Sequence, residues 1–438
     1  MAVEQTTKAD IIVIGGGMVG LASAIALRDR GLDVLLCDPG EARARTSYGN
    51  AGVVSRGSIF PMSSPALWAK LPTYLRNADR GLRLRHTHVA RVLPWTAHFL
   101  ASARTSAWER AAAALVPLTS AALPEHLGLA ERAGAGHLIR RCGWIKLYRT
   151  PEAFAGAALE RAILARHGVA VDLLDAEAVR EAEPALIRAY AHGMLLPETG
   201  AVSDPGALME AYQQLYADLG GRSLRMVTTG LQPTEDGWQV RHAEGAVRAR
   251  QVVLAAGAAS GEIARGLGYR FAFAAERGYH THYALHPDSP ALTRPVLDTG
   301  AGSIIAPMGE GRVRVLSGVE LNARAAPPDY VQIEAAAREA AGTLRLGANL
   351  DNRPWMGARP STPDGLPVIG PAPRHRGLIF AFGHGHIGLS TGPITGRLVA
   401  DLATGCEPAI PVAPFAPQRL LGWPRRRPPQ PDGAMARP

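Results

Sequence analysis

Ile11-Ile12-Val13-Ile14-Gly15-Gly16-Gly17-Met18-Val19-Gly20 is the stretch that decides the fold of this chain. Four β-branched residues, typical of a buried strand, lead directly into the pattern Gly15-x-Gly17-x-x-Gly20. An alanine-rich segment with helical character follows, and a second apolar strand runs over 34–37. Strand, glycine-rich turn, helix and strand in this order predict a βαβ unit that binds a dinucleotide.

The three glycines and Asp38 have separate tasks in such a unit. Gly15 permits the tight turn, Gly17 lets backbone N–H groups approach a pyrophosphate, and Gly20 lets the helix pack closely on the strand. The pyrophosphate then lies at a helix N-terminus, where unpaired N–H groups and the helix dipole favour negative charge. Asp38 ends the second strand and can accept hydrogen bonds from a ribose diol. We therefore expect bound FAD or NAD.

Length and composition are those of an ordinary soluble enzyme. The chain has 438 residues, 47% hydrophobic and 19% charged, which predicts two domains with a substantial core. No apolar run reaches the roughly 20 residues of a membrane span, and Met1 to Asp10 lacks the pattern of a signal peptide. Cys37, Cys142 and Cys406 lie far apart without metal-ligand spacing, so we expect the reducing cytosol.

The formal net charge of +9 has two visible sources. One is Arg425-Arg426-Arg427, among prolines near the end of the chain. The other is the stretch 76–91, where arginines interleave with apolar residues and Asp79 is the only acid. A solvated arginine face over a packed helix is one interpretation, and peripheral contact with an anionic membrane, or with a respiratory partner, is the other. Nucleic-acid binding is disfavoured. We therefore expect a cytoplasmic enzyme, and a location at the inner face of the membrane is the alternative.

Strand-like segments return at intervals along the chain. Gln251 to Gly257 is an apolar strand that ends on small residues, and Leu378 to Phe382 is a buried-type strand that enters a glycine-rich turn. Residues 64–133 predict alanine-rich helices broken by prolines 72, 94, 117 and 124, and the segment 417–438 predicts a disordered tail. A nicotinamide-binding domain is usually contiguous. Three separate segments that contribute strands to one sheet therefore favour a flavoprotein with a second domain assembled from insertions.

Four motifs together carry a family resemblance. They are the opening glycine motif, the loop Thr46-Ser47-Tyr48-Gly49-Asn50-Ala51-Gly52, the run from Gly357 to Gly370 (GARPSTPDGLPVIG) and the turn from Gly383 to Ser390. Over residues 9–416 the chain resembles the FAD-dependent amino-acid oxidoreductases of the D-amino-acid oxidase superfamily, and its nearest branch resembles the bacterial D-amino-acid dehydrogenases. Relatives that oxidise sarcosine often tether the flavin through a cysteine near the C-terminal flavin-binding segment. No cysteine occurs from Gly357 to Ser390, so we expect non-covalent FAD.

The resemblance implies a fold that combines α/β and α+β parts. A discontinuous Rossmann-type FAD-binding domain, at 9–60, 195–268 and 355–416, is expected to carry an inserted antiparallel-sheet substrate domain at 61–194 and 269–354.

The cofactor contacts expected fall in the motifs and in the strand ends between them. Small residues in the 46–52 loop would let the backbone lie against the flavin, and the positive end of the helix after the last turn would stabilise negative charge on the reduced ring. The alternatives are a plain surface turn and a glycine turn needed only for packing. The expected contact residues are Gly15, Gly17, Gly20, Asp38, Thr46, Ser47, Asn50, Ala51, Gly52, Val227, Gly257, Gly383, Gly385, Gly388, Leu389 and Ser390.

Arg359 is the candidate anchor for a substrate carboxylate. Its planar guanidinium matches a carboxylate with two parallel hydrogen bonds, and the family places a substrate-binding arginine at this motif position. A structural salt bridge with Asp364 is the alternative. Tyr279 could offer its hydroxyl to the same carboxylate or could be a buried core tyrosine, and Arg277 is a weaker second anchor.

His384 and His386 form a His-x-His pair on the glycine-rich turn. No third ligand has a recognisable spacing, so we expect no metal. His386 is the third candidate catalytic residue, because it lies nearest the expected flavin-contacting helix. A polar turn residue without a catalytic task is the alternative.

These residues predict oxidative deamination of a small amino acid, expected to be of D configuration. Hydride passes from Cα to flavin N5, and the imino acid hydrolyses to a 2-oxo acid and ammonia. The electron acceptor would be a quinone, an electron carrier or oxygen. The alternatives are an oxidase or dehydrogenase of glycine, sarcosine, proline or hydroxyproline, an NAD-linked dehydrogenase, and a non-catalytic flavin-binding subunit.

Overall fold

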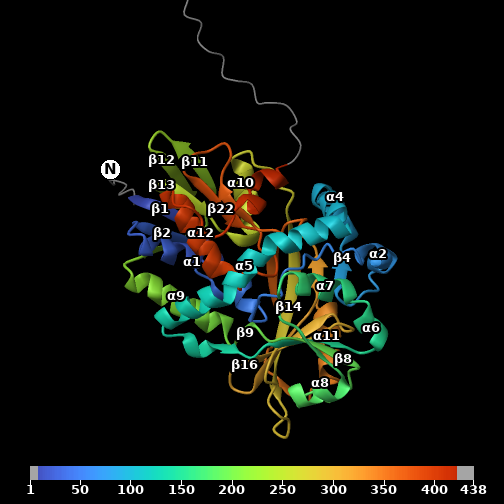
Figure 1. The fold of residues 1–438 in the computed structure, drawn as a ribbon. Coiled ribbons are helices and arrows are strands. Elements are labelled where there is room, and N and C mark those ends of the chain that lie inside the picture. The colour runs from blue at the N-terminus through green and yellow to red at the C-terminus, as the bar shows by residue number, and fades with distance from the viewer. Residues whose placement is uncertain (1–7, 422–438) are drawn as a thin grey trace, which may run out of the picture.

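Strand β1 (Lys8–Ile14) lies inside an eight-stranded sheet in the computed structural model, which describes residues 8–421 (Figure 1). Its parallel neighbours are β2 (Val34–Asp38) and β13 (Gly245–Leu254), and β13 pairs in parallel with β22 (Leu378–Phe382). Three segments far apart in the sequence therefore share one sheet, as predicted. The other strands of this sheet are β10 (Arg222–Arg225), β11 (Gly230–Thr234), β12 (Gly237–His242) and β21 (Val368–Pro371).

Helices α1 (Met18–Asp29) and α12 (Gly392–Thr404) lie side by side on this sheet (Figure 1). Glycines bring the two backbones together: a Cβ on Gly392 would lie 2.4 Å from Met18 Cγ, and one on Gly396 would lie 2.5 Å from the Ala22 backbone. Because these contacts join matching positions of the two helices, their N-termini are adjacent. Both helices follow parallel strands that end at the same edge of the sheet.

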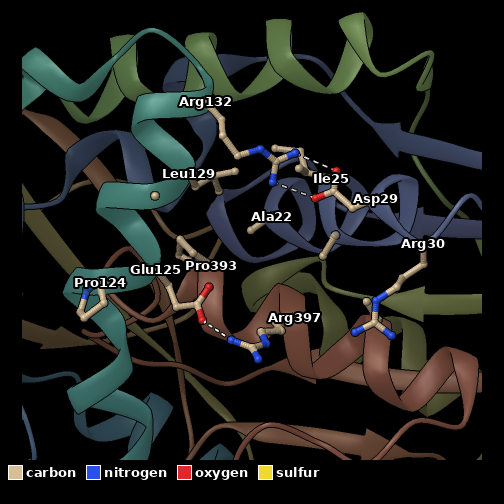
Figure 2. Close-up of a pocket in the computed structure, with 13 residues that line it drawn as sticks. Ala22, Ile25, Asp29, Arg30, Pro124, Glu125, Leu129, Arg132, Pro393 and Arg397 are labelled. Carbon is tan, nitrogen blue, oxygen red and sulfur yellow. Dashed lines mark hydrogen bonds and ion pairs between the residues drawn. The ribbon is translucent and has the colours of Figure 1, made fainter.

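A long helix, α5 (Thr105–Arg132), crosses this helix pair. The three helices line an open pocket of about 500 Å³ with two ion pairs beside it, Arg132 with Asp29 at 2.7 Å and Arg397 with Glu125 at 2.8 Å (Figure 2). The prolines at 117 and 124 lie inside α5, so the predicted breaks are wrong there. The buried residues recur at helical spacing along α5, and this packed face outweighs the backbone hydrogen bonds that the prolines remove.

A second, eleven-stranded sheet forms the other half of the molecule. Most of its pairs are antiparallel, as expected, but β15 with β6 and β18 with β4 are parallel. Its strands are β4 (Leu82–Leu84), β6 (Trp144–Tyr148), β7 (Asp172–Leu174), β8 (His192–Leu196), β14 (Ala274–Leu285), β15 (Val296–Asp298), β16 (Ser303–Met308), β17 (Arg312–Leu316), β18 (Val319–Leu321), β19 (Leu346–Asn349) and β20 (Trp355–Ser361). The expected boundary at 355 is therefore wrong, because β20 pairs with β14 along its whole length.

The remaining elements cover these sheets or connect them. A small sheet joins β3 (Val53–Ser55), β5 (Ile139–Arg141) and β9 (Thr199–Val202). The other α-helices are α2 (Leu67–Leu75), α3 (His86–Arg91), α4 (Leu93–Ser102), α6 (Pro151–Ala155), α7 (Ala158–Arg166), α8 (Ala176–Ala182), α9 (Pro205–Asp218), α10 (Ser260–Gly266) and α11 (Val331–Ala341). The 3-10 turns are η1 (Ala42–Ala44), η2 (Thr46–Gly49), η3 (Gly136–Leu138), η4 (Gly257–Ala259), η5 (Ala413–Phe415) and η6 (Pro417–Leu420).

The predicted tail begins too early. Within η6, Pro417 and Leu420 are buried, and Arg419 pairs with Asp364 at 2.8 Å. Apolar burial and this ion pair order the segment as far as Leu421, which forms an isolated β-bridge with Phe271. The rest of the predicted tail, with the arginine run at 425–427, lies outside the described residues, as does the part of the predicted polar N-terminus before residue 8.

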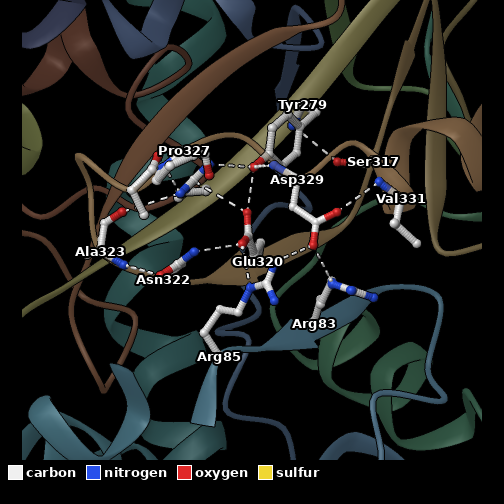
Figure 3. A network of polar contacts seen from close by, with 12 residues as sticks. Arg83, Arg85, Tyr279, Ser317, Glu320, Asn322, Ala323, Pro327, Asp329 and Val331 are labelled. Carbon is white, nitrogen blue, oxygen red and sulfur yellow. Dashed lines mark hydrogen bonds and ion pairs between the residues drawn. The ribbon is translucent and has the colours of Figure 1, made fainter. Parts of the chain in front are cut away.

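Three arginines of the stretch 76–91 form ion pairs with carboxylates of the second half of the chain, and Figure 3 shows two of them, Arg83 and Arg85. Arg83 and Arg85 both pair with Asp329, and Arg85 lies 3.6 Å from the buried carboxylate of Glu320. Arg80 pairs with Glu339. These contacts favour the structural interpretation of the basic stretch. Across residues 8–421, no helix has both the length and the apolar character needed to cross a membrane.

The glycine contact between α1 and α12 can be tested against a matched glycine. Gly396→Ala places a methyl group 2.5 Å from the backbone of Ala22, and we expect it to lower the free energy of unfolding by about 1–3 kcal/mol. Gly128→Ala in α5 meets no atom within 4 Å, so better helix propensity should raise stability by about 0.5–1 kcal/mol. Urea unfolding of both variants measures the difference, and equal stabilities would contradict the packing argument.

Candidate active site

The opening glycine motif has the geometry that a dinucleotide site requires. Gly15 has a φ of +107°, and a Cβ there would lie 2.5 Å from the Ala255 carbonyl oxygen. A Cβ on Gly20 would lie 1.8 Å from the Gly15 carbonyl oxygen, which confirms the close approach of α1 to the turn. At Gly17 a Cβ would meet no heavy atom within 4 Å. Gly17 thus borders open space at the N-terminus of α1, where the pyrophosphate is expected.

Asp38 lies at the carboxyl end of β2 and faces this turn. Its Oδ2 accepts a hydrogen bond from the Gly16 N–H at 2.5 Å, and its Oδ1 accepts one from Arg45 at 2.9 Å. Val227 is 64% exposed and follows Met226, whose N–H donates to the Asp38 carbonyl. Gly257, after β13, has a φ of +54° and open space at its Cβ position. The cofactor contacts of Asp38, Val227 and Gly257 stay predictions.

The Thr46 to Gly52 loop is tied to both halves of the protein, which argues against a plain surface turn. The Thr46 hydroxyl donates to the Ala358 carbonyl of β20 at 2.7 Å, and the Ser47 hydroxyl accepts from the Met18 N–H at 3.4 Å. Asn50 Oδ1 accepts from the Gly52 N–H at 2.9 Å. Small residues let the loop lie close to its neighbours. The loop's Ala51 lines the cavity described below.

Arg314 of β17 binds the backbone of this loop, a role that the sequence motifs did not predict. Its guanidinium is 3% exposed and donates to the Tyr48 carbonyl at 3.0 Å and the Asn50 carbonyl at 2.6 Å. Burial lowers the pKa of Arg314 to about 10, so the group stays protonated near neutral pH. The sequence carries no signal for this role, because the alternation of arginine and valine over 312–315 places Arg314 on the face opposite the valines, yet every residue from Val313 to Leu316 is buried.

The last turn contains buried donors without acceptors. Gly383 and Gly385 have φ values of +83° and +50°, and α12 begins only at Gly392, later than predicted. The backbone N–H groups of Gly388, Leu389 and Ser390 find no hydrogen-bond partner among residues 8–421, although Leu389 and Ser390 are 1% and 2% exposed. Buried N–H groups are rarely left unpaired, so this turn fits the anionic edge of a bound flavin.

His126 of α5, a second residue that the sequence analysis missed, fixes this turn. It is fully buried, with Nε2 2.8 Å from the Leu389 carbonyl oxygen and Nδ1 3.1 Å from the Tyr212 hydroxyl. Burial lowers the pKa of His126 to about 4, so the imidazole is neutral at physiological pH. The neutral ring donates from Nε2 to the carbonyl and accepts from the tyrosine.

One cavity of about 1140 Å³ is lined by the 46–52 loop, by the Gly383 to Ser390 turn and by strands of the second sheet. Helices α2 and α4 supply an apolar wall that includes Leu71, Trp95 and Phe99. The predicted site residues that line the cavity are Thr46, Asn50, Ala51, Tyr279, Arg359, Gly385, His386 and Ser390.

Arg359 presents its guanidinium to this cavity from β20. The group lies against Gly278 of β14, where a Cβ would be 2.3 Å from Nη2, and it donates to the Gly318 carbonyl at 3.3 Å. Within the described part of the chain no carboxylate oxygen lies within 4.0 Å of it, and Asp364 pairs with Arg419 instead. The salt-bridge alternative is thereby removed. Burial lowers the pKa of Arg359, and the nearby Glu276 charge opposes that shift.

Tyr279 belongs to a buried polar network (Figure 3), and Arg277 donates a hydrogen bond to it. The Tyr279 hydroxyl accepts from Arg277 Nη2 at 2.7 Å and from the Asp329 N–H at 3.1 Å, and it donates to Glu320 at 2.5 Å. All its hydrogen-bonding positions are filled, so the expected hydroxyl contact to substrate is not available in this structure, and the buried-tyrosine alternative is favoured. Arg277 is fully buried and also donates to the Pro327 carbonyl, which removes it as an anchor.

Glu276 is a buried carboxylate in the cavity wall that the sequence analysis did not single out. It is 4% exposed and lies opposite Arg359 in the pairing of β14 with β20. Its Oε2 is 3.0 Å from His386 Nε2, and its Oε1 accepts from the Ser361 hydroxyl at 2.7 Å. His384 instead contacts Thr395 at 3.0 Å, so the two histidines diverge. In residues 8–421 no three His, Cys, Asp or Glu side chains gather as a metal site needs.

The glycine-rich βαβ unit, the shared sheet and the donor-rich turn define a dinucleotide-binding flavoprotein. The FAD dependent oxidoreductase (DAO) family model matches residues 10–402. The chain belongs to this family, as the sequence motifs predicted, and FAD is its cofactor.

Two relatives match almost the whole chain. D-amino-acid oxidase from Bradyrhizobium diazoefficiens is 34% identical over 94% of this chain and 99% of that protein. D-amino acid dehydrogenase from a Methylobacterium species is 31% identical over 93% of this chain and 98% of its own length. The fold matches the solved structure of glycine oxidase from Geobacillus kaustophilus with a TM-score of 0.75 and 24% identity, over 95% of this chain and all of the other.

The open space at Gly17 gives a test that separates folding from cofactor binding. Gly17→Val adds a side chain that meets no protein atom within 4 Å at its Cβ, in backbone geometry that valine adopts readily. We expect the cofactor-free variant to unfold at a temperature close to that of the cofactor-free parent. Flavin absorbance per polypeptide should fall at least tenfold, because the side chain would fill the pyrophosphate position. Full flavin content would place the pyrophosphate elsewhere.

Proposed function

We propose that this protein uses FAD to oxidise the Cα–N bond of a small amino acid to an imine. The observation that carries the proposal is the Arg359 guanidinium, which faces the cavity without a carboxylate partner in the described residues. The same cavity is lined by the 46–52 loop and the Gly383 to Ser390 turn, the two segments that fit a flavin.

Arg359 would bind the substrate carboxylate through its planar fork. Charge-assisted hydrogen bonds of this kind contribute roughly 1.5–3 kcal/mol each, and the partly buried position limits competition from water. The bare backbone at Gly278 sets how deep the guanidinium lies, because any side chain there would displace it. Arg359 therefore acts by fixing the amino acid in one orientation, which supplies much of the rate enhancement when a substrate reacts with a bound cofactor.

FAD, when bound, supplies the hydride acceptor for the Cα hydrogen. The unpaired N–H groups of Gly388, Leu389 and Ser390 provide fixed donors for negative charge on the cofactor. The apolar wall from α2 and α4 keeps water from the reacting atoms. The imino acid then leaves and hydrolyses to a 2-oxo acid and ammonia.

The names of the relatives support amino acids of D configuration as substrates. Glycine oxidase from Pseudomonas putida, 29% identical over 94% of this chain, supports glycine as the second candidate. We take the acceptor for the electrons to be oxygen, a quinone or an electron carrier. Peripheral contact with a membrane is supported by the apolar side chains of Met62, Trp68, Leu75 and Leu93, which are 49–63% exposed.

An anaerobic titration tests the proposed activity directly. The flavin-loaded protein is mixed with a panel of D- and L-amino acids, glycine, sarcosine and proline, and the flavin absorbance is followed. We expect small D-amino acids to bleach the flavin with release of ammonia and the matching 2-oxo acid. A flavin that none of these amines bleaches would favour the non-catalytic flavin-binding alternative.

The carboxylate anchor is tested by Arg359→Lys and Gly278→Ala. The lysine loses the bidentate geometry, and the alanine methyl group pushes the guanidinium out of place. We expect KM to rise at least tenfold in both variants, while flavin content stays at the parental level. Gly309→Ala, whose Cβ meets nothing within 4 Å in the turn between β16 and β17, is the matched control and should keep the parental KM. A parental KM in both test variants would remove Arg359 from the anchor role.

A further inference from the structure

The contact between Glu276 and His386 has a defined hydrogen-bond direction. An ionised carboxylate can only accept, so at 3.0 Å the proton lies on His386 Nε2. Glu276 is ionised: burial alone would raise its pKa, but the hydrogen bond from His386, the one from Ser361 and the charge of Arg359 together hold the pKa below its usual value. Whenever the His386 ring carries a single proton, this contact fixes it in the Nε2–H tautomer.

The other ring nitrogen of His386 is left free to accept a proton. Nδ1 has no hydrogen-bond partner among residues 8–421, and the side chain is 38% exposed where it borders the cavity. His384, two residues earlier on the same turn, differs in every respect. It is 2% exposed, it contacts Thr395, and burial lowers its pKa to about 3.

The Glu276–His386 pair lies close to Arg359, so one small region could hold both charged groups of an amino acid. Glu276 and Arg359 are directly opposite each other on adjacent strands, so their Cβ atoms are roughly 5 Å apart. The carboxylate and ammonium groups of an amino acid are attached to the same carbon. A substrate whose carboxylate binds Arg359 therefore has its ammonium group within the same small region of the cavity.

We propose that His386, oriented by Glu276, is the base that removes a proton from the substrate ammonium group. An N–H bond of the substrate breaks, its electron pair stays on nitrogen, and the proton forms an N–H bond at His386 Nδ1. The Glu276 carboxylate stabilises the resulting imidazolium. This inference rests on the proposed function, because only the neutral amine has the lone pair that forms the imine as hydride leaves Cα. His386 is then a catalytic residue, and Glu276 is a positioning residue.

The surrounding charges are consistent with this role. The charged partner of His386 is Glu276 from β14, and the charge of Arg359 from β20 acts on Glu276 in turn, while the neighbouring His384 is neutral. The bound substrate carboxylate would offset the charge of Arg359, which leaves Glu276 to balance the imidazolium. The other charged side chains along the cavity are Lys70, Asp79, Arg80 and Lys146.

The base is tested by the pH dependence of kcat/KM for a D-amino acid in the parent and in His386→Gln. Positioned bases contribute about 10²–10⁴-fold, so we expect kcat/KM of the variant at neutral pH to fall at least 100-fold. The loss should shrink as the pH rises, because free amine then becomes available from solution. The control His98→Gln lies on the exposed face of α4, away from the cavity, and should keep the parental profile. An equal loss at every pH, or no loss, would overturn the assignment of His386 as the base.

The role of Glu276 is tested by Glu276→Gln and Glu276→Asp in the flavin-loaded protein. We expect the glutamine to lower kcat/KM at neutral pH at least tenfold and the aspartate to restore part of it. In ¹⁵N spectra of histidine-labelled protein, the His386 signal, identified by its loss in His386→Gln, should report the Nε2–H tautomer in the parent and a tautomer mixture in Glu276→Gln. An unchanged tautomer with unchanged kinetics would overturn the positioning role.

Failure of this inference is distinguishable from failure of the proposed function. If amino acids bleach the flavin of the parent and His386→Gln has the same pH profile, oxidation stands and the base is wrong. If no amino acid bleaches the flavin of the parent at any pH, the proposed function itself fails.

Discussion

The close contact of α1 with α12 is the constraint on which the rest of the structure depends. The helices meet because Gly392 and Gly396 offer bare backbone to Met18 and Ala22, and any larger residue would separate them. This contact sets two helix N-termini beside each other at one edge of the first sheet. The Gly15 to Gly20 turn, where we expect the pyrophosphate, and the donor-rich turn at Gly388 to Ser390 are thereby held at a fixed separation, although they lie near opposite ends of the sequence.

In the proposed function the second sheet supplies substrate recognition through direct pairing of two strands. Direct pairing of β14 with β20 places Glu276 opposite Arg359, and the glycine at 278 lets the guanidinium lie flat against the strand. Charge of both signs therefore faces the same part of the cavity. Deeper in this sheet, the Tyr279 hydroxyl bonds to both Arg277 and Glu320, so these polar groups engage one another and not the pair of Glu276 and Arg359.

The sequence predicted most of the first sheet, because its strands are continuous apolar runs whose ends carry recognisable glycine motifs. The turn at Gly15 to Gly20, the strand at Leu378 to Phe382 and the discontinuous sheet all lie where the motifs placed them. Predictions made from local patterns were wrong where long-range contacts determine the structure. The prolines in α5 are tolerated because a packed helix face surrounds them, and β20 joins the second sheet through pairing that local sequence does not encode.

The functional residues divide in the same way. Arg359 can be predicted from a motif, whereas Glu276, Arg314 and His126 acquire their roles only through partners brought close by the fold.

Parallel pairing of β13 with β22 has a consequence for biosynthesis. During translation β12 and β13 emerge long before β22, so the edge of β13 at 252–254, beyond its pairing with β12, remains without a partner until almost the whole chain has left the ribosome. Completion of the flavin-binding half is thus a late, long-range event, and the nascent protein exposes an adhesive strand edge in the meantime.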